Sequence, residues 1–427
     1  MATFNGTGAD DLYTGVWNEL NIILGNGGKD TLTGGALSDS IDGGNAKDTI
    51  FGGIGDDLLI GGFDGDSISG GSGADEIRDG AGFDTVDGGS GDDLIDTTGG
   101  AKDEVNVLNC GSGSDVILGG KSDDLINGGI GEDLVSYATS SKGVTANFWN
   151  GLGSGGDAKN DTYAALEHAI GSAFADTFIG DTSANLFEGG DGADTIKARG
   201  GVDTLLGGGG NDLLMGGAGG DHIDGGGGVD TLSFEDSINA VTIDLATDSF
   251  TQNDAEGDSI ASIEIIKLGF GGGSLFGDGE DNHFVGGVNS DNMKGRAGND
   301  ILDGGGSSDQ LYGGAGDDTI IAGTAAEAFQ TQDNIFWDAT AEGDGDAPAT
   351  EVIVDFDNDS DKLFFQSFTS SPDFSNWTET AIDWVGAYDA DSDVDDLQVV
   401  TDVGITLILL NMTAADFTID DTVGVVP

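Results

Sequence analysis

Apolar residues recur along much of this chain at intervals of nine positions, and each follows an aspartate by two places. Residues 88–96 show the unit in full: two glycines, a variable residue, a third glycine, one further residue, Asp93, and then the apolar Ile95. Aspartates keep this spacing without a gap from Asp30 to Asp93. Because one fixed period repeats a core residue together with an acidic side chain, it predicts a solenoid of stacked repeats.

The same period predicts how the repeats stack. The glycine-rich part of each unit forms a turn, and the three residues after the aspartate form a short strand with one side chain facing inwards. Two units complete one coil, and successive coils stack as parallel strands. We therefore expect an all-β fold, a right-handed parallel β-roll in three blocks with two inserted strand modules and a C-terminal β cap. An aspartate such as Asp39 should lie near the aspartate 18 positions later, Asp57.

The composition of the turns indicates their ligand. Calcium takes about six to eight oxygen ligands in a flexible cage, which glycine turns supply as carbonyl groups and aspartates as carboxylates. We predict multiple calcium ions, each lying between the aspartates of neighbouring coils. The predicted ligands are Asp30, Asp39, Asp48, Asp57, Asp66, Asp75, Asp84, Asp93, Asp115, Asp124, Asp133, Asp194, Asp203, Asp212, Asp221, Asp230, Asp291, Asp300, Asp309 and Asp318.

The roll is expected to depend on this metal. One buried apolar side chain in nine residues does not offset the conformational entropy lost when nine glycine-rich residues become ordered. Stacked carboxylates on adjacent coils also repel one another. We therefore expect the metal-free chain to be unfolded, with calcium binding supplying the folding free energy.

Two interruptions divide the repeats, and they are copies of each other at an offset of 97 residues, as Glu167 and Glu264 show. Each contains an alternating, strand-like segment, residues 144–148 and residues 241–245. After residue 324 the glycine repeat stops and aromatic residues increase, which predicts a separate region of β character. The predicted segments are roll block 1 (1–136), a spacer (137–175), block 2 (176–233), a second spacer (234–281), block 3 (282–323) and the C-terminal cap with a secretion signal (324–427).

Charge excludes several classes of partner. The 427 residues include 79 acidic and 13 basic side chains, and 65 of the acidic ones are aspartate. The net charge of −66 argues against binding to nucleic acid or to an anionic membrane face. The apolar stretch at residues 405–410 is too short to span a bilayer. No basic segment followed by an apolar one begins the chain, which predicts the absence of a cleavable signal peptide.

No motif for catalysis stands out. The chain contains neither His-Glu-x-x-His nor Gly-x-Ser-x-Gly, and its three histidines, His168, His222 and His283, do not favour a zinc site.

Three further residues differ from the regular repeat and are candidates for a separate role. Cys110, the single cysteine, takes a glycine position of a degenerate repeat and is interpreted as a drifted glycine, with no internal disulfide. Glu167 and Glu264 occupy copied positions in the spacers, where a structural hydrogen bond is favoured over a catalytic role.

The nonapeptide resembles that of the RTX family of haemolysin-type calcium-binding proteins over residues 30–318. Residues 354–363 resemble the post-repeat segment of serralysin-type secreted proteases, and residues 415–419 look like part of an uncleaved C-terminal type I secretion signal. The resemblance implies export of an unfolded chain, followed by folding in extracellular calcium. Serralysin-type proteases and RTX toxins carry a catalytic or pore-forming domain ahead of their repeats. Because these repeats begin near residue 5, we expect no such domain here.

We therefore expect a secreted, non-enzymatic calcium-binding protein, extracellular or at the cell surface, with a structural, surface-layer or adhesion role. Its expected partners are calcium ions and the type I secretion apparatus, with cell-surface polysaccharide or self-association as further candidates. Two alternatives stay open: an extracellular enzyme that acts on polysaccharide or lipid from a site in the spacers, and a membrane-active RTX protein.

Overall fold

The computed structural model describes residues 1–100 and 104–321 with their side chains, and beyond them the backbone of seven strands between residues 334 and 425. The chain divides into two compact units: residues 1–216 with 221–230, and residues 217–220 with 231–427. The described residues of both units form β-strands and three short 3-10 helices, which confirms the predicted all-β class.

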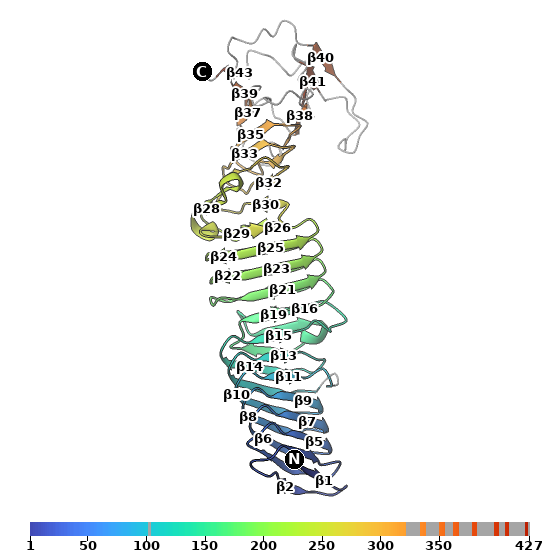
Figure 1. Ribbon diagram of the computed structural model, residues 1–427. Coiled ribbons are helices and arrows are strands. Elements are labelled where there is room, and N and C mark those ends of the chain that lie inside the picture. Colours follow the sequence, from blue (N-terminus) through green and yellow to red (C-terminus); the bar gives the residue numbers. More distant parts are fainter. Residues whose placement is uncertain are drawn as a thin grey trace. The chain divides into compact units, whose positions relative to one another are not determined.

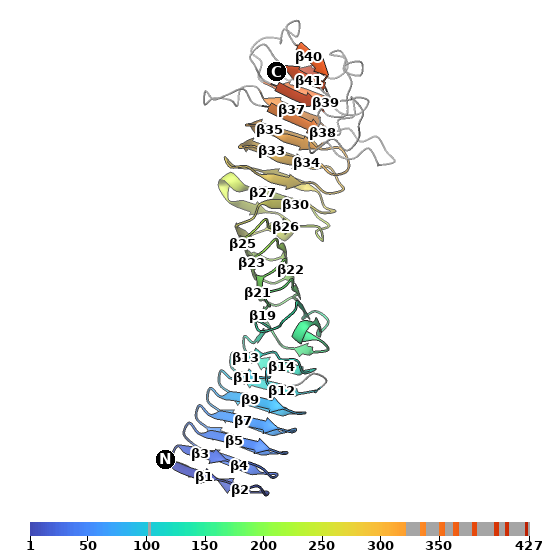
Figure 2. The ribbon, with the colours of Figure 1, turned by 90° about the vertical axis from the view of Figure 1, so that its right-hand side faces the viewer.

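The first unit is a parallel β-solenoid with two strands in each regular coil (Figures 1 and 2). Its first sheet contains, in spatial order, β1 (Ala2–Asn5), β3 (Asn21–Leu24), β5 (Ser40–Asn45), β7 (Leu58–Phe63), β9 (Glu76–Ala81), β11 (Leu94–Asp96), β13 (Val116–Leu118), β15 (Leu134–Ser136), β19 (His168–Ile170), β21 (Leu186–Asp191), β23 (Thr204–Gly209) and β25 (His222–Gly227). Its second contains β2 (Leu12–Thr14), β4 (Thr31–Gly35), β6 (Thr49–Ile54), β8 (Ser67–Ser72), β10 (Thr85–Ser90), β12 (Val107–Ser112), β14 (Leu125–Ile130), β18 (Thr162–Ala164), β17 (Leu152–Gly155), β16 (Val144–Asn147), β20 (Thr177–Ile179), β22 (Thr195–Gly200) and β24 (Leu213–Ala218).

The register of these strands is the predicted one. Ser40 of β5 lies opposite Leu58 of β7, and Thr49 of β6 lies opposite Ser67 of β8. Each pair is parallel and 18 residues apart, so one coil takes two nonapeptides. The prediction of a parallel β-roll is therefore confirmed.

The core of the first unit is a single row of apolar side chains from each sheet. The strand residue two places after each aspartate points inwards, and its neighbours on either side point outwards, as the alternation of a strand requires. Ile41, Leu59, Ile77 and Ile95 form one such row and are fully buried. The roll thus packs one branched aliphatic residue against the next coil, with little other apolar surface inside it.

An insertion lengthens one coil of the first unit. Thr85 of β10 lies opposite Val107 of β12, a separation of 22 residues instead of 18. Leu94 of β11 and Val116 of β13 show the same separation in the other sheet. The strands on both sides of this insertion stay in parallel register.

The first spacer adds a hairpin to the roll. Strand β16 pairs antiparallel with β17, and the chain then passes through the 3-10 helix η1 (Gly156–Ala158) to β18, which resumes parallel pairing with β14. Leu125 and Thr162 are opposite each other and 37 residues apart, so the spacer is looped out between two adjacent coils. The predicted strand at residues 144–148 is present as β16.

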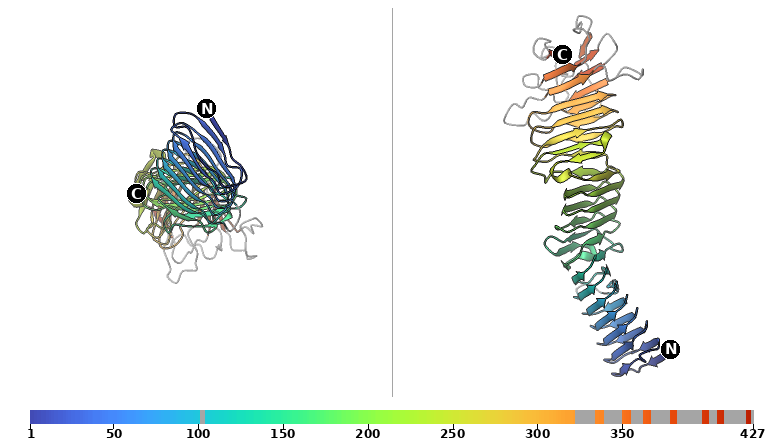
Figure 3. Two further views of the ribbon diagram at one scale, coloured as in Figure 1. Left: turned by 90° about the horizontal axis from the view of Figure 1, so that it is seen from below. Right: turned by 60° about the vertical axis from the view of Figure 1, so that its left-hand side comes forward.

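The second unit repeats this arrangement, as its stacked strands in Figure 3 show. Its first group of paired strands is β26 (Thr231–Ser233), β30 (Ile265–Lys267), β32 (His283–Val285), β34 (Ile301–Asp303), β36 (Thr319–Ile321), β38 (Thr350–Val354), β42 (Thr406–Leu409), β41 (Leu397–Val400) and β40 (Thr378–Ala381). Its second is β28 (Ser249–Thr251), β27 (Val241–Asp244), β31 (Gly273–Phe276), β33 (Asn292–Ala297), β35 (Gln310–Ala315), β37 (Asn334–Asp338), β39 (Lys362–Gln366) and β43 (Val423–Val425). The second spacer also contains η2 (Leu245–Thr247), η3 (Asn253–Ala255) and β29 (Ser259–Ala261).

The 97-residue offset seen in the sequence holds for the structure. Strand β16 maps onto β27, η1 onto η3, and β19 onto β30, residue for residue. The two spacers are therefore the same backbone module.

An arginine with a left-handed backbone faces each spacer hairpin. Arg199 (φ 80°) and Arg296 (φ 79°) are 97 residues apart and take a position that is glycine in the regular repeats. The Arg199 guanidinium lies 3.9 Å from the centre of the Trp149 ring. Arg296 donates instead to both carboxylate oxygens of Asp244, at 2.7 and 2.8 Å. Each arginine thus fastens a hairpin to the roll, by a different interaction.

The predicted C-terminal cap is described only as strand backbone, β37 to β43, which agrees with its predicted β character. The segment 355–361 and the tail at 410–422, which carry the resemblances to the protease segment and to the secretion signal, lie outside the described residues. The division into six segments stays a prediction.

The single inward residue per repeat predicts a large effect of cavity formation. Replacing the fully buried Ile77 with alanine should lower the free energy of unfolding of the first unit by about 2–5 kcal/mol. The matched change at Ile54, whose side chain is 49% exposed, should cost less than about 0.5 kcal/mol. Denaturant unfolding of the calcium-loaded protein measures both, and equal losses would contradict the assigned core.

Candidate metal sites

The repeat aspartates form two ladders, one on each loop side of the roll. The backbone N–H of Asp39 donates to Oδ1 of Asp57 at 2.6 Å, and the N–H of Asp57 donates to Oδ1 of Asp75 at 2.8 Å. The aspartates that accept such a bond from the preceding coil are Asp30, Asp39, Asp48, Asp57, Asp66, Asp75, Asp84, Asp93, Asp115, Asp133, Asp194, Asp203, Asp212, Asp221, Asp230, Asp300, Asp309 and Asp318. The expected neighbour relation at 18 residues therefore holds, in the form of a hydrogen bond.

The second carboxylate oxygen of many of these aspartates is buried and accepts no hydrogen bond. This holds for Oδ2 of Asp30, Asp39, Asp48, Asp57, Asp66, Asp75, Asp84, Asp93, Asp115, Asp133, Asp194, Asp203, Asp212 and Asp300. Buried polar atoms in folded proteins nearly always have a partner, and an unpaired buried carboxylate is costly. A row of them points to a cation as the missing partner.

Glycine makes room beside most of these unpaired oxygens. A Cβ added to Gly52 would lie 2.5 Å from Oδ2 of Asp57 and 2.5 Å from the carbonyl oxygen of Gly70 on the next coil. A Cβ on Gly43 would meet Oδ2 of Asp48 at 2.6 Å and the Gly61 carbonyl at 2.7 Å in the same way. The space that a side chain would fill is thus bounded by one carboxylate oxygen and a backbone carbonyl oxygen.

These donors fit calcium. We call the space beside each such glycine a glycine cradle. It offers hard oxygen atoms from a carboxylate and a carbonyl, which calcium prefers, and it offers no sulfur or imidazole, which transition metals would favour. Among the residues that the structure describes, no group of three or more His, Cys, Asp or Glu side chains could hold a metal ion. A site bounded by one carboxylate oxygen and a glycine carbonyl oxygen is not such a group, so the ladder draws on the glycine backbone as well as on the aspartates.

Burial without a counterion changes the acidity of the ladder. Burial is the largest cause and raises the pKa of Asp57 and of Asp66 to about 7, with like charges on neighbouring coils adding to it. The backbone N–H from the preceding coil acts in the opposite direction. Without a cation, burial therefore disfavours the charged form of the aspartates in the ladders.

Two of the predicted ligands differ from the rest. Asp291 accepts from the N–H of Gly273 through Oδ1 and from the N–H of Gly287 through Oδ2, so both its oxygens are satisfied. Asp124 is fully buried, and its Oδ2 accepts from the Thr97 hydroxyl at 3.1 Å. The sequence placed both in the repeat and gave no sign of these partners.

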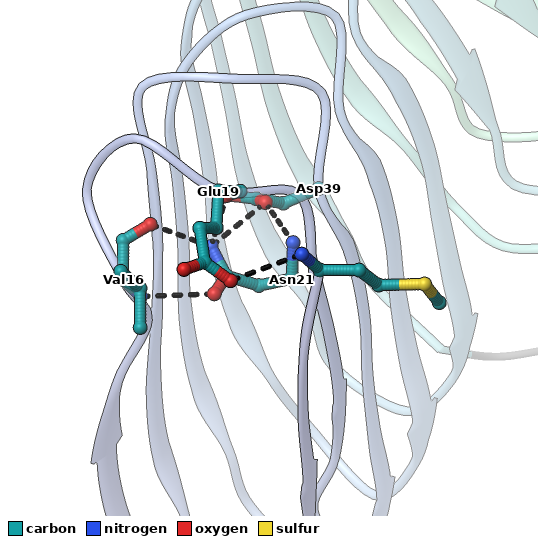
Figure 4. Close-up of polar contacts among 5 residues, drawn as sticks. Val16, Glu19, Asn21 and Asp39 are labelled. Carbon is teal, nitrogen blue, oxygen red and sulfur yellow. Dashed lines mark hydrogen bonds and ion pairs between the residues drawn. The ribbon is translucent and has the colours of Figure 1, made fainter.

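Other polar groups occupy aspartate positions at the ends of the ladders. Asn21 donates from Nδ2 to Oδ1 of Asp39 at 2.9 Å and to the carbonyls of Glu19 and Val16, which surround it in Figure 4. Glu167 accepts from the N–H of Asp133 through Oε2 at 3.0 Å, which confirms the structural hydrogen bond expected of it. Sequence reasoning did not assign Asn21, although its position 18 residues before Asp39 was the available signal.

Among the described residues, the cysteine and the histidines do not form a metal site. Cys110 is fully buried at the first-glycine position of its repeat, where burial raises the pKa of its thiol above the usual range. His222 is exposed on the outer side of β25, and His168 lies 3.3 Å from Glu132. No helix among the described residues is long and apolar enough to cross a membrane.

A side chain placed in one glycine cradle should reduce the number of calcium ions that the protein binds. Gly52→Ala places a methyl group against Asp57 Oδ2 and the Gly70 carbonyl, so we expect the number of bound calcium ions to fall by one or two and the calcium midpoint of folding to rise. Gly27→Ala is the control, because its Cβ would come no nearer than 3.9 Å to any atom. Isothermal titration calorimetry measures both, and an unchanged stoichiometry in Gly52→Ala would contradict the cradle.

The raised pKa values of the ladder aspartates predict an unusual pH dependence of folding without metal. Folding raises the pKa of these carboxyls from 3.8 to about 6 or 7, as for Asp48 and Asp57, so protonation favours the folded chain. This stabilisation is complete below the unfolded pKa and is lost as the pH rises through the folded pKa. In chelator the chain should therefore gain strand structure between about pH 8 and pH 5, measured by far-ultraviolet circular dichroism at low protein concentration. Loss of structure over that range would contradict the unpaired carboxylates.

The comparison with protein-family models agrees with this geometry. The model of the RTX calcium-binding nonapeptide repeat matches residues 21–41, 33–68, 69–101, 105–137, 170–205, 198–232 and 285–320, about half of the chain. No curated protein sequence matches. The solved structures that match include the extracellular lipase LipA from Serratia marcescens, at 18% identity over 59% of this chain. The chain spans 40% of that lipase chain, and the TM-score of 0.22 is too low to carry a structural argument.

The nine-residue period, the aspartate ladders and the glycine cradles agree with the family match, and RTX repeats of this kind bind multiple calcium ions. The chain belongs to the RTX family of calcium-binding nonapeptide-repeat proteins.

Proposed function

We propose that this protein leaves the cell unfolded through a type I secretion apparatus, folds when extracellular calcium fills its aspartate ladders, and then acts as a structural, surface-layer or adhesion component. RTX repeats imply a secreted calcium-binding protein. The proposal adds the route of export, the calcium-driven folding outside the cell, which we call the switch, and the structural role.

One observation supports the switch above all others. In repeat after repeat the buried aspartate has one oxygen bound to a backbone N–H and the other facing a carbonyl-lined space without a donor, as at Asp57 and Gly52. A cation there neutralises the carboxylate and links two adjacent coils. Because the unfolded chain has no such cradle, the free energy of calcium binding acts as folding free energy.

The low calcium concentration of a cytosol and the higher concentration outside give the switch its direction. A chain that stays unfolded until it meets calcium remains competent for export, and it cannot unfold back through the exporter once the ladders are filled. The net charge of −66 supports this view, because self-repulsion opposes folding before the metal is bound.

The proposed structural role is supported by two spacer side chains that form hydrogen bonds between coils. Glu167, the most individual acid of the first spacer, accepts a backbone hydrogen bond at the end of a ladder. His168 accepts from the N–H of Leu186 through Nδ1 at 3.1 Å and so also takes part in the coil-to-coil bonding. These groups serve the stacking of the roll, which supports a protein whose roll is itself the working part.

A calcium titration tests the switch. Circular dichroism of the purified chain should change cooperatively from coil to β structure on addition of calcium, with no comparable change on addition of magnesium, because magnesium demands a smaller octahedral site and releases its water reluctantly. Strand structure that is already complete in chelator would overturn calcium-driven folding. Hydrolysis of polysaccharide or lipid, or leakage from liposomes, by the calcium-loaded protein would overturn the structural role.

A further inference from the structure

One stretch of the first unit departs from the repeat at several positions that meet in space. Asp79, Thr97 and Ser122 stand where regular repeats have glycine, and Asn106 stands where they have the ladder aspartate. All four are buried, with exposed fractions of 0 or 1%. Although they are up to 43 residues apart in the sequence, hydrogen bonds join them into one network with Asp124, to which Ser122 and Asn106 are both bonded.

The amide of Asn106 lies at the centre of this network. Its Nδ2 donates to Oδ2 of Asp79 at 2.9 Å and to the hydroxyl of Ser122 at 3.2 Å. Its Oδ1 accepts from the N–H of Asp84 at 3.0 Å, so Asn106 keeps the ladder bond that an aspartate would make. A hydrogen-bond donor on Asn106 thus points at a buried carboxylate oxygen that stands where the regular coils have glycine.

The Thr97 hydroxyl completes this network. Its one hydrogen is shared between Oδ2 of Asp124 at 3.1 Å and the Leu118 carbonyl at 3.0 Å, and its oxygen accepts from the N–H of Gly120 at 3.0 Å. Burial raises the pKa of Asp124, while Ser122, Thr97 and Asn106 lower it as hydrogen-bond donors. Side chains therefore partner Oδ2 of Asp124, while its Oδ1 is buried without a hydrogen bond.

A second network continues on the next coil, around Tyr137. A Cβ added to Gly119 would meet the ring of Tyr137, with Cδ1 at 2.7 Å, where a Cβ on a regular glycine such as Gly43 meets a ladder carboxylate. The Tyr137 hydroxyl donates to Oδ2 of Asp161 at 2.6 Å and lies 2.8 Å from the hydroxyl of Tyr163. Oδ1 of Asp161 accepts from the N–H of Asp124 at 2.9 Å.

The Tyr137 network thus fills the cradle with an aromatic ring and gives Asp161 a partner for each oxygen. The ladder on the other side of the roll differs over the same coils. Asp93, Asp115 and Asp133 keep the regular pattern, with Oδ1 bound and Oδ2 buried without a partner. Side chains therefore replace part of the ladder only on the Asn106 side, where Oδ2 of Asp84 and Oδ1 of Asp124 still lack a partner.

We propose that the Asn106 amide and the Tyr137 hydroxyl take the place of bound calcium ions, and that the coils around them form a folding nucleus that is ordered at lower calcium than the flanking repeats. The inference rests on the proposed calcium-driven folding and specifies where that folding starts. In a solenoid, order propagates from a preformed coil to its neighbours, so such a nucleus sets the direction in which the first unit assembles.

The second spacer supplies an internal contrast. At the 97-residue offset Phe234 replaces Tyr137 and Ile260 replaces Tyr163, so the hydroxyl pair is missing from the copy although the backbone is the same. The nucleus is therefore specific to the first unit, and Tyr137→Phe converts one of its residues into that of the copy.

Hydrogen exchange of the full-length protein, followed by mass spectrometry along a calcium titration, tests the proposal. Residues 104–137 should gain protection at a lower calcium concentration than residues 30–66. Tyr137→Phe and Asn106→Asp should each raise the calcium midpoint of residues 104–137 by at least about twofold, because each removes a donor to a buried carboxylate. Asn127→Asp is the control, since it adds the same charge at an exposed position of β14 and should leave that midpoint unchanged.

The outcomes separate the two ideas. If residues 104–137 and 30–66 become protected at the same calcium concentration, or if both variants leave the midpoint unchanged, the nucleus is wrong while calcium-driven folding stands. If no segment gains protection on addition of calcium, the proposed switch fails and the nucleus fails with it. Should Tyr137→Phe not fold at any calcium concentration, Asn106→Asp alone decides between these results.

Discussion

The structure depends on one interaction, the sharing of each buried aspartate carboxylate between the backbone and a cation. Oδ1 binds the N–H of the aspartate one coil earlier, as between Asp57 and Asp39, and this bond fixes the register. Oδ2 is left in a space lined by a carbonyl. A core of one aliphatic side chain per strand cannot offset the desolvation of so many carboxylates, so folding requires the charge to be neutralised.

The need for that space explains why glycine dominates the turns and why its loss is informative. A Cβ at the first-glycine position falls onto the carboxylate and the carbonyl, as at Gly52. A larger side chain there must itself satisfy what the cation would have satisfied. Asp79 receives the Asn106 amide, and the Tyr137 ring brings a hydroxyl to Asp161. Departures from the repeat are thus grouped because a single substitution would leave an unpaired buried group.

Most of the fold was predictable because the period couples local and long-range geometry. Two nonapeptides per coil placed Asp39 near Asp57 and Ile41 inside the roll, and the 97-residue offset predicted the strand at 241–245 from that at 144–148. The details of the site were less accessible. The position of the cation between two ladder carboxylates stays a prediction, and the sequence did not show that Oδ1 accepts the N–H one coil earlier or that Oδ2 faces a glycine carbonyl. Nor did the sequence bring Asp79, Asn106 and Ser122 together, since the insertion between them changes the register by four residues.

The duplicated spacers show which of these features belongs to the backbone and which to the side chains. Strands and 3-10 helices of the two copies coincide residue for residue over β16, η1 and β19, while the contacts that hold them differ. Arg199 stacks on Trp149, and Arg296 forms a bidentate ion pair with Asp244. Both arginines keep a left-handed backbone, which costs a non-glycine residue about 1–3 kcal/mol. That the strain persists with two different partners indicates that the anchoring point is fixed by the backbone module, and that the partner is free to vary around it.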